Sequence, residues 1–301
     1  MPDFRTYIEF IAYKALATKF FLLPRPLCLA MGKGLGILAF HLDRKHRAVA
    51  LFNLAEAFGL EKSERERMFI ARDSFAHFGR VIADILKISH YSRKKIQRLI
   101  TAEGREHLVA ALARRKGVLL FTAHFGNWEI GSAWASEIAI FRVIARALDN
   151  RLIEKDLVRL RAKLGAQMIY KFGAGKHILR ALKRNEIVAI LIDQNVLRSQ
   201  AVFVDFFGKQ AATTPSLADL HLKTGAPLVP AFCHPVKNNR YLLKIMPPLE
   251  FVQTGSLEED ELKITQFCTK IIEQEIRRHP AAWLWVHKRW NTRPADEAPV
   301  S

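Results

Sequence analysis

One stretch of the 301-residue chain decides the fold, residues Val118–Glu129, which read VLLFTAHFGNWE. Its first part, Val118–Thr122, is a short apolar run of β-favouring residues with glycines close to both ends. Such a run predicts a buried strand that leads into a polar turn and then into a helix. The turn carries His124 and, five positions later, Glu129.

The sequence after Gly117 alternates between short apolar runs and helical patterns, which is typical of an α/β fold. We therefore expect a mixed, largely parallel sheet flanked by helices. The expected strands are 118–122, 141–145, 167–170, 187–192, 228–233 and 241–245. The expected helices are 128–138, 150–164, 176–185, 215–224 and 259–278.

The chain begins with two apolar segments, Phe4–Leu23 and Leu27–Leu42, separated by Pro24 and Pro26. Charged residues interrupt both segments, so neither predicts a clean membrane span. We interpret them as a membrane-facing helical hairpin, and a pair of ordinary core helices is the alternative. The expected organisation is a membrane-associated segment over residues 1–43, a catalytic domain over 44–294 and a flexible tail over 295–301.

The composition is strongly basic, with 47 Lys and Arg against 29 Asp and Glu and a formal net charge of +18. Such a surplus favours an anionic membrane surface, an acidic protein or nucleic acid as partner. The chain has no recognisable nucleic-acid-binding motif, and its basic residues are interleaved with large apolar ones, which favours a lipid interface. Its three cysteines have no C-x-x-C spacing, so neither a disulfide framework nor a cysteine-based metal site is expected.

His124 and Glu129 are the first candidate site residues. A carboxylate that fixes one imidazole nitrogen leaves the other free to take a proton from a hydroxyl. A structural histidine beside a helix-capping glutamate is the alternative. An amide, with Asn127 as the candidate, would stabilise the oxyanion of an acyl-transfer intermediate.

Other polar residues follow the predicted strands, at the edge of the sheet where ligands bind in α/β proteins. Arg146 follows the second strand and Asp193-Gln194 follows the fourth, although an ordinary strand-end turn also explains the latter. Phe206–Lys209 with Thr213 predicts a loop that leads into a helix, where the hydroxyl either caps the helix or lines a polar slot.

Competing chemistries lack their motifs. The chain contains no G-x-S-x-G, no G-x-x-x-x-G-K-[ST] and no H-E-x-x-H sequence, and its remaining histidines lack metal-ligand spacing. We therefore expect no metal and no cofactor. General-base catalysis remains, in which His124 activates an acceptor hydroxyl for direct attack on an activated acyl group.

Residues 124–129 resemble the His-x4-Asp/Glu motif of glycerolipid acyltransferases, in the variant of the bacterial lipid A biosynthesis acyltransferases. The resemblance runs from the region around Arg47 to Pro294 and covers most of the chain. Further stretches that carry it are Arg146 before Asp149-Asn150, Arg161 near Gly165, Asp193-Gln194, Phe206-Phe207-Gly208 with Thr213, and Trp285 to Pro294.

The resemblance implies a glycerolipid-acyltransferase-like fold and a late O-acyltransferase of lipid A biosynthesis on the cytoplasmic face of the bacterial inner membrane. The donor would be an acyl chain on acyl carrier protein, or on coenzyme A, and the acceptor a glycolipid hydroxyl. By the same resemblance, His124 and Glu129 are the catalytic pair. Arg146, Arg161, Asp193, Gln194 and Thr213 are supporting residues.

Two alternatives stay open from the sequence. Asp193-Gln194 is followed by Asn195–Arg198 instead of the aspartate and glycine of many family members, so the acceptor could be a phosphatidylinositol mannoside or another glycolipid or amino lipid. The chain could also be a non-catalytic membrane-binding module, which predicts that His124 and Glu129 lie apart. Acyl chain length and oligomeric state do not follow from the sequence.

Overall fold

The computed structural model describes residues 3–171 and 173–295. Its helices are α1 (Phe4–Leu22), α2 (Arg25–Leu42), α3 (Arg44–Phe58), α4 (Glu64–Ile88), α5 (Arg93–Gln97), α6 (Arg105–Ala113), α7 (Trp128–Ala135), α8 (Arg151–Lys163), α9 (Ala174–Lys183), α10 (Ser216–Thr224) and α11 (Leu257–Arg278). Its strands are β1 (Ile100–Glu103), β2 (Val118–Thr122), β3 (Phe141–Ala145), β4 (Ala166–Tyr170), β5 (Ile187–Leu191), β6 (Val202–Phe206), β7 (Lys209–Thr213), β8 (Leu228–Val236) and β9 (Arg240–Ile245).

The main sheet has the strand order β1-β9-β8-β2-β5-β3-β4. Only β8 and β9 pair antiparallel in it, and the other neighbours run parallel. The expected mixed, largely parallel α/β sheet is therefore confirmed. Each expected strand is present, and both its first and its last residue lie within three residues of the predicted bounds.

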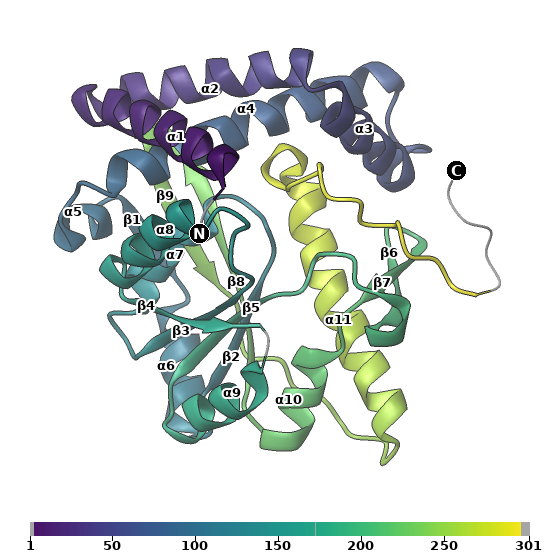
Figure 1. Ribbon diagram of the computed structural model, residues 1–301. Coiled ribbons are helices and arrows are strands. Elements are labelled where there is room, and N and C mark those ends of the chain that lie inside the picture. Colours follow the sequence, from purple (N-terminus) through teal and green to yellow (C-terminus); the bar gives the residue numbers. More distant parts are fainter. Residues whose placement is uncertain (1–2, 172, 296–301) are drawn as a thin grey trace.

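Strand β2 lies at the centre of the sheet, and all five of its residues are buried. Leu119 and Phe121 pack into a core cluster under α9, α10 and α11, whereas Val118 and Leu120 pack under α6, α7 and α8. Successive strand residues point to opposite faces, so a continuous apolar run marks a strand covered on both sides. Figure 1 shows the helices on both faces of the sheet.

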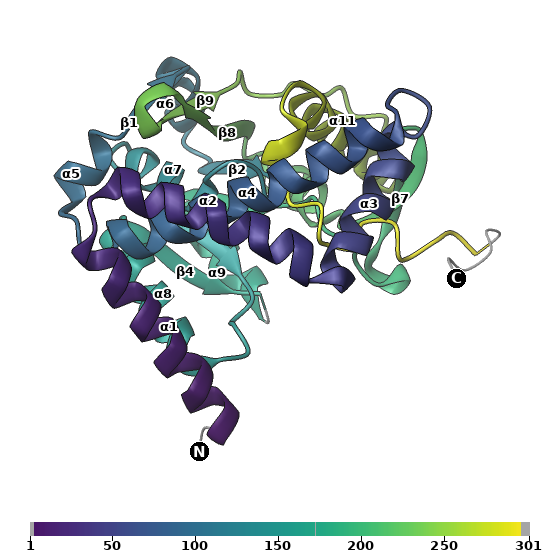
Figure 2. The ribbon, with the colours of Figure 1, turned by 90° about the horizontal axis from the view of Figure 1, so that it is seen from above.

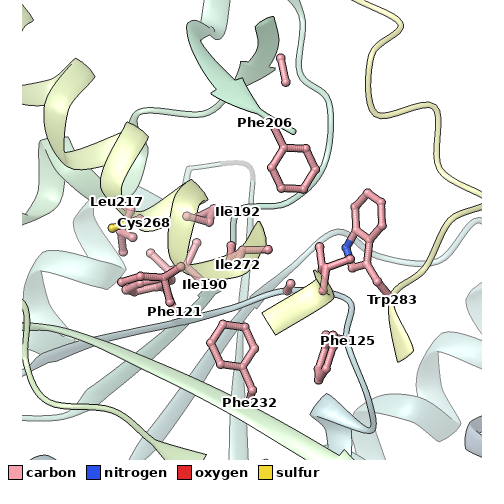
Figure 3. Packing of buried hydrophobic residues seen from close by; sticks show 14 of the residues in the cluster. Phe121, Phe125, Ile190, Ile192, Phe206, Leu217, Phe232, Cys268, Ile272 and Trp283 are labelled. Atoms are coloured by element: carbon pink, nitrogen blue, oxygen red, sulfur yellow. The ribbon is translucent and has the colours of Figure 1, made fainter. Parts of the chain in front are cut away.

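The structure contains a strand, β1, that no sequence pattern predicted, and it differs from the prediction in the segment before α10. The structure gives residues 202–213 as an antiparallel hairpin, β6–β7, instead of a loop. Phe207 and Gly208 form its turn, both with positive φ (59° and 76°), which suits the tight two-residue turns of hairpins. Phe206 of this hairpin packs in the core cluster with Trp283 (Figure 3).

The layer of α1, α2 and α4 lies above the sheet in Figure 1, and α1 diverges widely from α2 in Figure 2. Glycines bring α2 and α4 into contact, because a Cβ at Gly36 would stand 2.1 Å from the Phe75 carbonyl oxygen. Among the described residues, every helix is too short or too polar to cross a bilayer. Of the expected tail at 295–301, only residue 295 lies within the described residues.

Several large apolar side chains of α1 and α2 are nevertheless exposed. On α2 they recur every three or four residues and form a stripe along one side of the helix. The exposed residues are Phe4, Tyr7, Ile8, Ile11, Phe21 and Leu22 on α1, and Leu27, Met31, Leu35, Leu38 and Leu42 on α2.

Candidate active site

The turn after β2 is held in place by two distant segments. The N–H of Gly126 donates to the Ala282 carbonyl (2.9 Å), and the N–H of Leu284 donates to the His124 carbonyl (3.0 Å). On the other side, a Cβ at Gly126 would stand only 1.8 Å from the Cys233 carbonyl oxygen, and its φ is +60°. Only glycine fits this position, so the backbone that carries His124 is fixed before any substrate arrives.

The carboxylate that orients His124 is Asp193. Nδ1 of His124 lies 2.9 Å from Oδ1 of Asp193, and the backbone N–H of His124 donates to Oδ2 at the same distance. The sheet explains this meeting, because β2 and β5 are parallel neighbours with Thr122 opposite Leu191. Each side chain follows its strand by two residues and therefore emerges at the same edge of the sheet.

Asp193 carries a negative charge in a fully enclosed place. A third donor, the indole Nε1 of Trp283, lies 2.8 Å from Oδ2. Burial alone would raise the pKa of this carboxyl, but the imidazole of His124 and the hydrogen bonds lower it to about 2. A fixed anion at Nδ1 holds the His124 proton there and leaves Nε2 as the basic nitrogen.

Nε2 of His124 faces the accessible side of the site. The side chain of His124 is 22% exposed, and the amide nitrogen of Gln194 lies 3.4 Å from Nε2. The ring of Trp128 stands edge-on to the imidazole with 5.2 Å between centroids. The arrangement suits a general base that receives a proton from a hydroxyl brought to Nε2.

Glu129 has a different partner from the one expected. Its carboxylate takes a two-pronged ion pair with the Arg161 guanidinium of α8, including an Nε–Oε2 distance of 2.9 Å. Burial alone would lower the pKa of Arg161, and pairing with Glu129 raises it above its ordinary value. The expected orientation of His124 by Glu129 is therefore corrected: in the first turn of α7 this side chain points toward α8, and Asp193 occupies Nδ1.

The remaining expected residues lie in different surroundings. Asn127 is fully buried and caps α7 through a hydrogen bond from the Ile130 N–H (3.3 Å), so its side chain is directed away from the accessible face. Arg146 is exposed at the end of β3 and pairs with Asp149 at 3.0 Å. Thr213 is buried at the end of β7 and bonds to Arg289. The structure does not bring Asn127, Arg146 or Thr213 to the imidazole.

Trp283 is a residue of the site that no sequence pattern predicted. Its indole binds Asp193, its backbone pairs with Phe125, and its carbonyl accepts from the Ser74 hydroxyl (2.8 Å) of α4. Figure 3 shows its ring near Phe125. A tryptophan-rich segment near the C-terminus was the available signal, but nothing in its spacing points to a residue in the middle of the chain.

The described residues offer no candidate ligand cluster for a metal and no candidate thiol nucleophile. Within residues 3–171 and 173–295, no three His, Cys, Asp or Glu side chains gather as ligands. All three cysteines are buried, and burial raises the pKa of the Cys233 and Cys268 thiols. A buried thiol of raised pKa is a poor nucleophile.

Comparisons with known proteins show the family of the chain. The model of the family described as bacterial lipid A biosynthesis acyltransferase matches residues 2–292. The chain is 27% identical to a lipid A biosynthesis palmitoleoyltransferase of Escherichia coli K12 over 92% of this chain and 89% of the relative. It is 28% identical to a lauroyltransferase of the same strain, over 90% and 88%. A phosphatidylinositol mannoside acyltransferase of Mycobacterium tuberculosis H37Rv is 25% identical over 72% and 69%.

Proposed function

This acyltransferase belongs to the bacterial lipid A biosynthesis acyltransferase family, and we propose that it moves a fatty acyl chain from acyl carrier protein to a hydroxyl of a membrane glycolipid. A lipid A precursor is the acceptor we place first, because the family and its lipid A relatives match over most of the chain. The observation that carries the proposed chemistry is the 2.9 Å contact between His124 and Asp193.

In the proposed reaction, Nε2 of His124 takes the proton of the acceptor hydroxyl while the hydroxyl oxygen attacks the thioester carbonyl carbon. The tetrahedral intermediate then collapses: the C–S bond breaks, an ester remains on the acceptor, and the thiol leaves with the proton from His124. Asp193 stabilises the imidazolium formed in between. No covalent acyl-enzyme is needed, so donor and acceptor bind together.

Glu129 and Arg161 take a supporting part in this proposal. Their buried ion pair joins the first turn of α7 to α8. Helix α7 begins at Trp128, only four residues after His124. The pair therefore positions the turn without touching the reacting atoms. The amide of Gln194 lies beside Nε2, which supports the proposal that this side chain contacts the acceptor.

Charge and exposure support the donor and the location that we propose. A formal net charge of +18 is complementary to acidic acyl carrier protein and to anionic lipid. The exposed apolar side chains of α1 and α2 suit helices that lie on a membrane surface, which we propose is the cytoplasmic face of the bacterial inner membrane. Acyl-coenzyme A, which offers the same thioester, is the alternative donor.

A binding module, another acceptor and thioester hydrolysis are the alternatives to this proposal. The separation of His124 from Glu129 is what a non-catalytic membrane-binding module predicts, but Asp193 supplies the missing carboxylate and the relatives are named acyltransferases. A different acceptor is favoured by one observation, the match to phosphatidylinositol mannoside acyltransferases. Thioester hydrolysis, with water in place of the acceptor, is expected only as a slow side reaction.

The test mixes the purified protein with one donor and one acceptor. The donor is acyl carrier protein or coenzyme A, loaded with the same acyl chain, and the acceptor is a lipid A precursor or a phosphatidylinositol mannoside. Product masses identify the donor and acceptor. His124→Ala should abolish transfer with an unchanged circular dichroism spectrum, whereas His177→Ala, an exposed histidine on α9, should retain it. Substantial transfer by His124→Ala would refute the mechanism.

A further inference from the structure

A second polar site lies outside the catalytic pair. A cleft of about 290 Å³ opens between α2, α4 and the turn that joins β8 to β9. Lys33 of α2, Arg80 of α4 and Arg240 at the start of β9 all line it. Three cations from three separate elements thus converge on one hollow.

These cations lack compensating anions in the part of the chain that the structure describes. Lys33, Arg80 and Arg240 are exposed, and none of them takes part in an ion pair or side-chain hydrogen bond within residues 3–171 and 173–295. Asp73 also lines the cleft, but its carboxylate is bonded to Arg72 at 3.0 Å. A bound dianion would relieve the mutual repulsion of the three cations through charge-assisted hydrogen bonds.

Backbone packing forces two of the cations together. A Cβ at Gly32 would lie 2.5 Å from the Gly79 carbonyl oxygen, and one at Gly79 would lie 2.1 Å from the Gly32 carbonyl oxygen. The helices α2 and α4 therefore touch at this glycine pair. Lys33 and Arg80 are the next residues along their helices, so the close contact places both at the edge of the cleft.

The third cation is held by a buried network. Arg25 forms two hydrogen bonds with the fully buried Asp84 (2.7 and 2.8 Å), and its Nη1 donates to the Asn239 carbonyl (2.6 Å). The Tyr241 hydroxyl donates to the same carboxylate at 2.6 Å. Arg240 lies between these two anchored residues. The cleft is thus organised in advance, which lowers the entropy cost of binding.

We propose that this cleft binds the phosphate monoester headgroup of a membrane lipid. Arg presents a planar set of donors that matches phosphate oxygens, and Lys adds a point charge. The lipid origin is argued from α2, which supplies Lys33 to the cleft and also carries the exposed apolar stripe from Leu27 to Leu42. The proposal rests on the membrane position given above for α1 and α2 but not on acyl transfer.

The cleft also adjoins the catalytic turn. His77 lines it, and Nε2 of His77 lies 3.3 Å from the Gly126 carbonyl oxygen. One side chain therefore separates a headgroup in the cleft from the turn that carries His124. A bound lipid would be anchored next to the reaction centre without contacting the imidazole.

The test compares binding of the full chain to three vesicle types: phosphatidylcholine alone, and phosphatidylcholine with either phosphatidic acid, a monoester, or phosphatidylglycerol, a diester, at matched surface potential. The cleft variant is Arg80→Gln/Arg240→Gln. The control is Lys183→Gln/Arg184→Gln, which removes the same charge from exposed positions at the end of α9, far from α2 in Figure 1.

Wild type and control should prefer phosphatidic acid vesicles, and the cleft variant should bind them roughly tenfold or more weakly and lose the preference. A second arm measures thermal unfolding with inorganic phosphate or chloride at equal ionic strength. Phosphate could stabilise the wild type but not the cleft variant, while the wild type shows no preference between vesicles. That combination would support a phosphate site, assign it to a soluble phosphate and overturn the lipid source.

Equal binding by the cleft variant and the wild type in both arms would overturn the proposal. The proposal would also be overturned if the α9 control lost as much binding to both anionic vesicles as the cleft variant, because such a loss is an effect of total charge. Binding requires no turnover, so the vesicle preference should persist in His124→Ala. A failed transfer assay and a failed binding assay are therefore separate results.

Discussion

The imidazole of His124 and the carboxylate of Asp193 lie 2.9 Å apart although 69 positions separate them in the chain. The parallel pairing of β2 with β5 makes this contact, and the Trp283 indole closes the far side of the carboxylate. The site is thus assembled from three segments, and each can be tested separately.

Asp193→Asn should retain the fold but lower kcat by roughly 10³- to 10⁴-fold, because an amide neither fixes the His124 tautomer nor stabilises the imidazolium. Initial rates with saturating donor and acceptor measure the effect. Trp283→Phe, which removes only one donor to Asp193, should cause a smaller loss. Near-normal turnover by Asp193→Asn would rule out Asp193 as the orienting carboxylate.

Arg161→Met should destabilise the protein by about 3–5 kcal/mol, because it leaves the Glu129 carboxylate buried without its partner. Glu129→Gln/Arg161→Met removes both charges and should recover much of that free energy of unfolding. Urea denaturation at neutral pH gives the values. If the double variant loses more free energy of unfolding than the two single variants lose together, the description of Glu129 and Arg161 as a pair is contradicted.

Gly126→Ala should cost several kcal/mol of unfolding free energy, since it adds a collision with the Cys233 carbonyl to the strain of a positive φ. Gly208→Ala is the matched control, because Gly208 has a φ of +76° and no heavy atom within 4 Å of its Cβ position. The difference between the two variants isolates the close approach. Equal losses would show that only the backbone conformation matters.

Gly36→Ala should destabilise the protein because its methyl group would stand 2.1 Å from the Phe75 carbonyl oxygen. Gly34→Ala, two positions earlier on α2, meets nothing within 4 Å and should stabilise by up to about 1 kcal/mol through better helix propensity. Thermal unfolding of both variants checks that the two substitutions change the stability in opposite directions. A stabilising Gly36→Ala would disprove the contact between α2 and α4.

Acidification should destabilise the protein through His77. Burial lowers the pKa of His77 from 6.5 to about 4, with Arg80 contributing, although its hydrogen bond to the Gly126 carbonyl opposes this. Between these values the unfolded chain binds a proton that the folded chain does not, so the free energy of unfolding falls as pH drops from about 6.5 to 4. The loss from this residue is at most about 3 kcal/mol.

Measuring urea unfolding at several pH values for wild type, His77→Gln and His177→Gln tests this assignment. His77→Gln should flatten the decline, and His177→Gln, at an exposed position, should leave it unchanged. An identical decline in His77→Gln would assign the pH dependence to other groups.

The sequence by itself determined the class of fold and the candidate base, His124. Val118–Phe121 is apolar at each position, which is typical of a strand covered by helices on both faces, and the observed burial of the whole strand agrees. The same continuous pattern located β5, and the glycine of the turn marked where the chain leaves β2. Short segments without that signal were missed, among them the four-residue strand β1, which alternates in burial at the edge of the sheet.

The tertiary structure alone decided which carboxylate contacts the imidazole of His124. Sequence proximity favoured Glu129, five positions from His124, but the first turn of α7 directs it to Arg161. Asp193 reaches the imidazole because strand register aligns Thr122 with Leu191, and Trp283 joins because a C-terminal segment pairs with the turn. Local sequence encodes which residues form strands and turns. Strand register and chain crossing depend instead on how distant apolar faces pack, and that packing placed the Asp193 carboxylate beside the His124 imidazole.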